Sequence, residues 1–124
     1  MAKKPPRISE AEWEAMRVVW ARGSVTAQQV VDALADHGWS PRTVKTLLNR
    51  LKTKGALGYE ARGKAYVYRP AVRMEDCVRQ ESQSFLDRVF GGATAPLLAH
   101  FVRRAKLSKA EIDELRKILT EKRP

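Results

Sequence analysis

The sequence has one cysteine and no long hydrophobic run, and both shortages limit what the chain can be. Cys77 alone cannot form an internal disulfide or a cysteine-cluster metal site. We expect it to pack as a small apolar side chain, with an intermolecular redox bridge as the alternative. No stretch approaches the roughly eighteen apolar residues of a membrane span, and no apolar run follows the basic residues 1–7. We therefore expect no signal peptide, no membrane insertion and a cytoplasmic location.

Residues that carry chemistry are also few. The two histidines, His37 and His100, are isolated, and neither a glycine-rich phosphate loop nor a His/Glu metal spacing occurs. A lone histidine directly before Gly38 is typical of a helix C-terminal cap. The sequence therefore predicts no catalytic residue, no metal and no cofactor, so we do not expect an enzyme.

Acidic residues are nearly absent from one segment. The 124 residues carry a formal net charge of +10. Residues 40–69 hold eight Lys and Arg side chains against one acid, Glu60, whereas residues 71–124 hold eleven basic and eight acidic side chains. Such focused charge indicates an anionic partner, which could be nucleic acid, a membrane surface or an acidic protein. The change in charge balance predicts a domain boundary near Pro70.

The N-terminal part is typical of three short helices. Ser9 to Glu12 and Thr26 to Gln29 each fit a capping box, and Gly23 and Gly38 are expected to end those two helices. The third helix is predicted by its boundary residues and by its apolar spacing of i, i+3, i+4, i+7. Those residues are Ser40 as N-cap, Pro41 in the first turn, Gly55 past the end, and Val44, Leu47, Leu48 and Leu51 on one face.

A basic-tipped hairpin is expected to follow the third helix. Residues 57–60 and 65–69 contain aromatic and β-branched side chains, and Arg62-Gly63-Lys64 forms a turn between them. A hairpin placed directly after a three-helix unit is called a wing. The predicted fold class is therefore mainly α with a small β-hairpin wing. We expect the chain to consist of a basic flexible N-terminus at 1–7, a winged helix-turn-helix DNA-binding domain at 8–70 and a helical dimerisation domain at 71–124.

Residues 71–124 predict three more helices with wide apolar faces. They cover about 74–90, the segment after Thr94 and Pro96, and the segment opened by a capping box from Ser108 to Glu111. About fifty residues without a sheet do not easily bury such faces, so we expect pairing with a second copy. The residues expected at this homodimer interface are Val78, Phe85, Leu86, Val89, Phe90, Leu97, Leu98, Phe101, Leu115, Ile118 and Leu119.

The outer face of the third helix has the side chains that read double-stranded DNA. An α-helix fits the major groove, where Arg and Lys bind guanine, Asn binds adenine, and Thr offers a hydroxyl and a methyl group. The candidates for contacts with base edges or adjacent phosphates are Arg42, Thr43, Lys45, Thr46 and Asn49. The candidates for contacts with the DNA backbone are Arg50, Lys52 and Lys54. At the wing tip, Arg62 and Lys64 would reach a flanking phosphate or the minor groove. A protein-interaction winged helix and a non-specific architectural DNA-binding protein remain the alternatives.

From Ile8 to Lys122 the chain resembles the penicillinase repressor family of bacterial winged-helix regulators, the BlaI/MecI/CopY type. The matching stretches are Ile8 to Glu14 with Val19-Trp20, Trp39 to Leu51 with Lys54-Gly55, Phe90 to Gly92, and Leu107-Ser108 with Glu111-Ile112, Glu114 to Arg116 and Ile118-Leu119.

The resemblance implies a homodimeric transcriptional repressor on TACA/TGTA-type inverted repeats, commonly of genes for β-lactamase or a penicillin-binding protein. It also implies, as a further partner, a membrane sensor protease that relieves repression by cleaving the dimerisation domain. The corresponding bond here is His100-Phe101, with histidine where the family has asparagine. The cysteine cluster of the copper-responsive branch is missing, which excludes copper sensing through that site.

Overall fold

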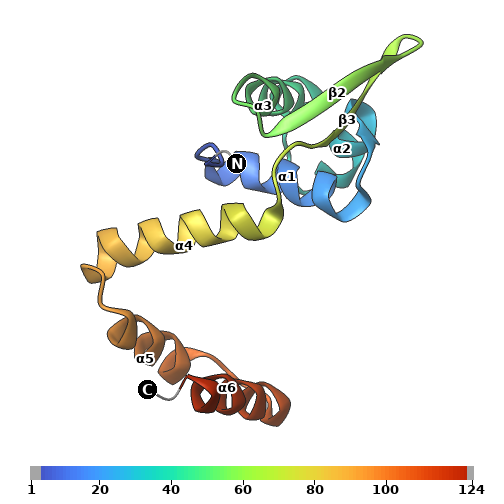
Figure 1. The fold of residues 1–124 in the computed structure, drawn as a ribbon. Coiled ribbons are helices and arrows are strands. Elements are labelled where there is room, and N and C mark those ends of the chain that lie inside the picture. Colours follow the sequence, from blue (N-terminus) through green and yellow to red (C-terminus); the bar gives the residue numbers. More distant parts are fainter. Residues whose placement is uncertain (1–3, 123–124) are drawn as a thin grey trace. The chain divides into compact units, whose positions relative to one another are not determined.

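The computed structural model describes residues 4–122 and divides the chain after Ser82 into two compact units (Figure 1). The first unit contains α1 (Glu10–Arg22), β1 (Val25–Thr26), α2 (Ala27–Ala33), the 3-10 turn η1 (Ala35–His37), α3 (Pro41–Thr53), β2 (Leu57–Arg62) and β3 (Ala65–Pro70). Helix α4 (Met74–Phe90) begins in this unit, and α5 (Thr94–Arg104) and α6 (Lys109–Glu121) lie in the second. The predicted fold class, mainly helical with a small antiparallel sheet, is confirmed.

The first two helices begin at the predicted capping boxes. The Ser9 hydroxyl accepts from the Glu12 amide at 3.2 Å while the Glu12 carboxylate accepts from the Ser9 amide at 2.8 Å. Thr26 and Gln29 repeat the arrangement at the start of α2. These reciprocal bonds satisfy amides that a helix leaves unpaired in its first turn, which is why both helices start where the sequence predicts.

The second helix ends earlier than the sequence predicts. Helix α2 stops at Ala33, and the chain continues through η1 before Gly38 adopts a left-handed conformation with φ of 70°. The expectation that one helix runs to Gly38 is therefore wrong, because the last residues tighten into 3-10 geometry. His37 lies beside another helix, with its Nε2 3.4 Å from the Glu14 carboxylate and its ring centroid 4.7 Å from that of Trp39.

Helix α3 follows its prediction closely. The Ser40 hydroxyl accepts from the Thr43 amide at 3.1 Å, and Pro41 occupies the first turn, where its missing amide costs nothing. Gly55 lies just beyond the helix with φ of 85°, a conformation that side-chain-bearing residues rarely adopt. Both ends of α3 are therefore fixed by local interactions, and the residues between them determine which side of the helix is buried.

The sheet has three antiparallel strands in the order β1-β3-β2. Strands β2 and β3 pair from Leu57 with Pro70 to Arg62 with Ala65, which leaves Gly63-Lys64 as a two-residue loop. The positive φ of Gly63 suits a tight hairpin turn of this length. Strand β1 pairs Val25 with Tyr68, a pairing that sequence periodicity does not indicate in a strand of two residues.

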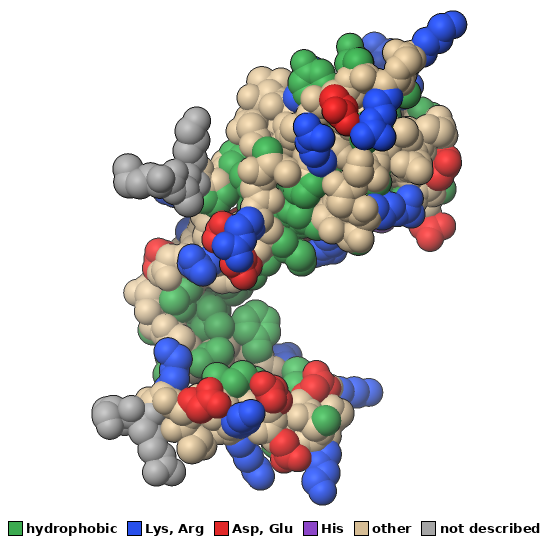
Figure 2. Space-filling view, turned by 45° about the vertical axis from the view of Figure 1, so that its right-hand side comes forward, with side chains coloured by type: hydrophobic (Ala, Val, Ile, Leu, Met, Phe, Trp, Pro, Cys, Tyr) green, Lys and Arg blue, Asp and Glu red, His purple; other side chains and the backbone are tan. Residues whose placement is uncertain are grey.

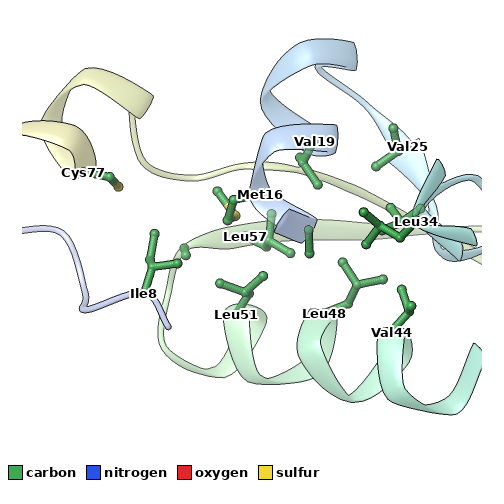
Figure 3. Packing of buried hydrophobic residues seen from close by; sticks show 13 residues of the cluster. Ile8, Met16, Val19, Val25, Leu34, Val44, Leu48, Leu51, Leu57 and Cys77 are labelled. Atoms are coloured by element: carbon green, nitrogen blue, oxygen red, sulfur yellow. The ribbon is translucent and has the colours of Figure 1, made fainter. Parts of the chain in front are cut away.

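The hydrophobic core draws side chains from each α-helix and strand of the first unit. The predicted face of α3 is buried: in Figure 3, Val44, Leu48 and Leu51 point from α3 into the cluster, with Leu51 facing Leu57 and Val44 facing Leu34, and Leu47 is buried as well. Each such side chain contributes about 1.5–3 kcal/mol relative to exposure, so this packing fixes which face of α3 turns outward.

The first turns of α4 belong to this same unit. Cys77 is buried in the core cluster, and the Trp20 indole donates to the Val72 carbonyl at 3.0 Å. The Gln80 amide donates to the Pro6 carbonyl at 3.4 Å and thereby connects α4 to the N-terminal residues. The compact unit therefore continues beyond the boundary expected near Pro70, because the segment after the hairpin packs back on α1. Of the N-terminus expected to be flexible, residues 1–3 lie outside the described residues.

The second unit contains α5, α6 and the C-terminal part of α4. Ser108 caps α6 through the predicted box with Glu111, and three phenylalanines pack loosely, with Phe85 centred 6.1 Å from Phe90 and 6.3 Å from Phe101. None of the described residues from 83 to 122 is buried. Within residues 4–122, no helix has both the length and the hydrophobicity that crossing a membrane requires.

Candidate nucleic-acid interface

The outer face of α3 is polar, cationic and open to solvent. Arg42, Thr43, Lys45, Thr46 and Asn49 are all exposed, opposite the buried Val44, Leu47, Leu48 and Leu51. The structure thus brings the five predicted base-edge candidates together on one side of one helix. No acidic residue occurs between positions 40 and 55, so nothing on this helix competes with an anionic partner for the cations.

The two threonine hydroxyls on this face are already engaged locally. The hydroxyls of Thr43 and Ser40 lie 3.1 Å apart, and the Thr46 hydroxyl donates to the Arg42 carbonyl at 3.0 Å. With its proton used in the helix, Thr46 presents an oxygen that can accept and a methyl group that can pack against thymine. Its side chain is also held in one orientation, which lowers the entropic cost of a contact.

The predicted backbone contacts at the end of α3 divide into two kinds. Arg50 is exposed, and the Lys52 ammonium lies 4.6 Å from the centre of the Tyr59 ring on β2. Lys54 instead lies against α1, where its Nζ is 2.7 Å from a Glu12 carboxylate oxygen and 2.9 Å from the Arg7 carbonyl. Lys54 therefore differs from the other candidates in having an ion-pair partner within the protein, although its side chain is still 33% exposed.

The Glu12–Lys54 ion pair is unusual because Glu12 is only 2% exposed. Burial is the largest single influence on this carboxyl and disfavours its charge, yet hydrogen bonds from Lys54 and Ser9 together with the Lys54 charge outweigh it. The pKa of Glu12 consequently lies below its ordinary value. Sequence reasoning missed this pair because nothing in the spacing of two residues on different helices reveals their contact.

The hairpin tip extends the cationic surface. Figure 1 shows β2 and β3 projecting past the helices, and Figure 2 shows Lys and Arg side chains on this unit and at its far end. Glu60, the one acid of residues 40–69, lies 2.9 Å from Arg62 and 3.8 Å from Arg69. Arg62 is thus partly neutralised, whereas Lys64 lies in the turn itself.

Two exposed tyrosines on the hairpin were not predicted as site residues. Tyr59 and Tyr66 are 48% and 53% exposed, with ring centroids 5.4 Å apart in an edge-to-face arrangement. The signal that could have found them is the hairpin register. A two-residue loop at 63–64 places both rings on one face of the sheet.

The residues predicted for the dimer interface also divide between the units. Phe85, Leu86, Val89, Phe90, Leu97, Leu98, Phe101, Leu115, Ile118 and Leu119 lie in the second unit, where exposure reaches 51% at Phe101 and 63% at Leu119. Figure 2 shows hydrophobic side chains gathered on the C-terminal helices. Val78 belongs to the first unit instead, where it lines a shallow groove with Trp13 and Met74.

The His100–Phe101 bond lies inside α5. Both side chains are exposed, and their rings are 5.7 Å apart in an edge-to-face arrangement. Because an α-helix holds its backbone in hydrogen bonds, a protease would need this helix to open locally before it could reach the bond.

Three helices, a short sheet and a projecting basic hairpin after an amphipathic third helix define a winged helix-turn-helix unit. The penicillinase repressor family model matches residues 8–121, and the chain belongs to this family of DNA-binding transcriptional repressors, which are not enzymes. The chain is 39% identical over 120 residues to the penicillinase repressor of Bacillus licheniformis, an alignment that covers 96% of this chain and 94% of that protein.

Two further comparisons agree with this assignment. The methicillin resistance regulatory protein MecI of Staphylococcus aureus is 34% identical over 123 residues, which cover 98% of this chain and all of MecI. The solution structure of the B. licheniformis BlaI monomer in complex with the blaP half-operator is 41% identical, with a TM-score of 0.53 over 60% of this chain and 93% of BlaI. The family resemblance inferred from the sequence is therefore confirmed.

Proposed function

We propose that the chain represses transcription as a homodimer bound to an inverted-repeat operator of the TACA/TGTA type. The observation that carries the proposal is the exposed, acid-free face of α3, which includes Lys45 and Asn49, followed in the chain by the hairpin with its basic tip. Two such faces related by a two-fold axis read two half-sites about one helical turn apart. We expect the protein to act in the cytoplasm on genes for β-lactamase or related cell-wall and stress functions.

The second unit supports the dimer. None of the described residues of α5, α6 and the part of α4 after Ser82 is buried, so this unit cannot stabilise itself by burial, and Leu98, Phe101 and Leu119 leave apolar surface in water. A second copy offers the same surface, and pairing like surfaces around a two-fold axis is the commonest way to cover one. The same axis then relates the two α3 helices as an inverted repeat requires.

Release from DNA is proposed to follow proteolysis in the second unit by a membrane sensor protease, at the bond between His100 and Phe101. Cutting α5 would divide the apolar surface that holds two copies together, and affinity for two linked half-sites would fall with the dimer. Intact-mass measurement after co-expression with such a protease should show fragments that end at His100 and begin at Phe101. Uncut protein, or a cut elsewhere, would reject this bond as the target.

The operator proposal is tested by titrating the protein into labelled duplexes. One duplex has a TACA/TGTA inverted repeat and the other a scrambled sequence, and both are measured at salt concentrations from about 50 to 200 mM. With six to ten phosphates engaged, affinity should fall about 10³- to 10⁵-fold over this range. A preference of about 10³-fold for the repeat, at two protomers per duplex, is the expected result.

The other outcomes point elsewhere. Steep salt dependence without preference would indicate an architectural DNA-binding protein or a different operator sequence. No binding to either duplex would indicate a winged helix that recognises a protein partner and would reject the proposed function.

A further inference from the structure

The hairpin exposes two aromatic rings that the core does not use. Tyr59 and Tyr66 are each about half exposed, whereas Tyr68 on the same face packs against the hydrophobic core cluster. Burial raises the pKa of Tyr68, and the neighbouring phenols of Tyr66 and Tyr59 add to that effect, in agreement with three clustered rings. Two of the three rings therefore remain available to a partner.

The strand register explains why these rings stand together. Tyr59 pairs with Tyr68, and Ala61 pairs with Tyr66, so the three rings lie on one face of the sheet. Leu57, two residues before Tyr59, is buried on this face. The tyrosine face is therefore the core-facing side of the sheet, continued outward along the hairpin beyond the last core contact.

A contact with α3 fixes where this tyrosine face lies. The Lys52 ammonium is 4.6 Å from the centre of the Tyr59 ring, within the range of a cation–π interaction. Lys52 belongs to the last turn of α3 and Tyr59 to β2. The Tyr59–Tyr66 pair consequently lies at the junction between the helix proposed to enter the major groove and the hairpin proposed to reach a flank.

The DNA at such a junction is a sugar–phosphate strand. A helix in the major groove, about 12 Å wide, is bordered by two backbones, and a hairpin that leaves the end of that helix must cross one of them. Tyrosine suits this strand because its ring packs on the sugar and its hydroxyl donates to a phosphate oxygen.

We propose that Tyr59 and Tyr66 are DNA-binding residues that hold one backbone strand through their hydroxyl groups, with Tyr59 also orienting Lys52 toward the same strand. This assignment rests on the proposed function and adds to it a neutral contact that the cationic candidates do not provide. Backbone contacts carry no sequence information, so the pair contributes to affinity and to the register of the protein on DNA.

The test is the double variant Tyr59→Phe/Tyr66→Phe, titrated into the operator and scrambled duplexes over the same range of salt. Both rings, their edge-to-face contact and the Lys52 interaction survive, and only the hydroxyls are lost. We expect affinity to fall about tenfold or more, since a hydrogen bond to a charged group has that effect. The fall should be equal on both duplexes, and the slope of affinity against salt should not change because no cation is removed.

Two control variants show how the loss of a different hydroxyl and the loss of a cation affect DNA binding. Tyr68→Phe removes a hydroxyl from the same strand and face without touching the exposed pair and should bind as the wild type does. Lys64→Gln should weaken binding and reduce the salt slope by about one. In a duplex scan, a single neutral methylphosphonate at the contacted phosphate should weaken the wild type more than the double variant, which retains Lys52 but has lost the hydroxyl donors.

The titrations distinguish a role of the two tyrosine hydroxyls in DNA binding from a role in packing. If the wild type prefers the operator and the double variant equals it within twofold, the tyrosines only pack the hairpin and the assignment is overturned. A loss accompanied by a smaller salt slope or a lower melting temperature would also overturn it, because the hydroxyls would then act through Lys52 or the fold. If the wild type binds neither duplex, the proposed function fails and this assignment with it.

Discussion

At the scale of single residues, Lys45 is the side chain whose role is most directly measurable. It is exposed on the outer face of α3, beside Thr46 in sequence, and its helix contains no acidic residue. If it donates to a guanine, Lys45→Ala should weaken operator binding by about 1 to 3 kcal/mol and scrambled-duplex binding much less. Lys117→Ala on α6 is the matched control and should change neither. Equal losses on both duplexes would reassign Lys45 to a phosphate.

Cys77, unlike the exposed Lys45, is a buried residue whose thiol reactivity is suppressed by the fold. It is 3% exposed in the core cluster, and burial, with a smaller effect from the Asp76 charge, raises the pKa of its thiol. Because the thiolate is the reactive form, we expect an aromatic disulfide reagent to label Cys77 only as fast as the fold opens. Stoichiometric labelling of the native protein within the mixing time would contradict this packing role and favour an intermolecular redox bridge.

At the scale of secondary-structure elements, the Glu12–Lys54 pair attaches the end of α3 to the start of α1. Removing the carboxylate by Glu12→Gln leaves Lys54, whose side chain is 33% exposed, to be hydrated in place of being paired. We expect a loss of about 1 to 3 kcal/mol in the free energy of unfolding at pH 7, measured by urea titration. The exposed Glu75→Gln, which breaks an ion pair with Arg73, should cost less than about 0.5 kcal/mol.

The Glu12–Lys54 pair should also make the stability of the protein depend on pH in a definite direction. The pKa of Glu12 in the folded protein lies below the ordinary 4.5, so its stabilising effect is fully present above that value and is lost as pH falls through the folded pKa. The stability difference between the wild type and Glu12→Gln should therefore be constant from pH 7 down to about 5 and should narrow below about 4.5. A difference that widens on acidification would contradict a carboxylate ion pair.

Local signals were sufficient to predict most of these elements. The capping boxes at Ser9, Thr26 and Ser108 act within four residues, so the sequence alone places those helix starts, and the spacing from Val44 to Leu51 predicts the buried face of α3. Side chains opposite a buried face must be exposed, which is why the base-edge candidates could be named from sequence.

Long-range contacts could not be predicted in this way. Strand β1 forms through the pairing of Val25 with Tyr68, and Lys54 forms an ion pair with the buried Glu12 on another helix. Cys77 enters the core because the chain after the hairpin folds back on α1, a path that no local pattern specifies. Each of these features depends on partners far apart in the sequence, and a charge pattern read locally does not reveal that Lys54 pairs with Glu12.

At the scale of the whole molecule, the proposal requires two copies joined through their second units. Phe85→Asp together with Leu119→Asp places two carboxylates on the apolar surface, where pairing would bury them unpaired. Sedimentation should show a monomer for this variant and a dimer for the wild type and for the matched control Lys109→Asp. A persistent dimer would reject this surface as the interface, and retained helicity by circular dichroism checks that the monomer is folded.

The measurement that tests the central claim most directly is the dependence of affinity on half-site spacing. A dimer with two α3 helices in fixed relation should bind an inverted repeat tightly. Inserting about five base pairs between the half-sites turns them to opposite faces of the duplex. This spaced operator should bind the protein no better than a single half-site does. Undiminished affinity after the insertion would show that the protomers bind independently and would contradict a dimer that reads a two-fold operator.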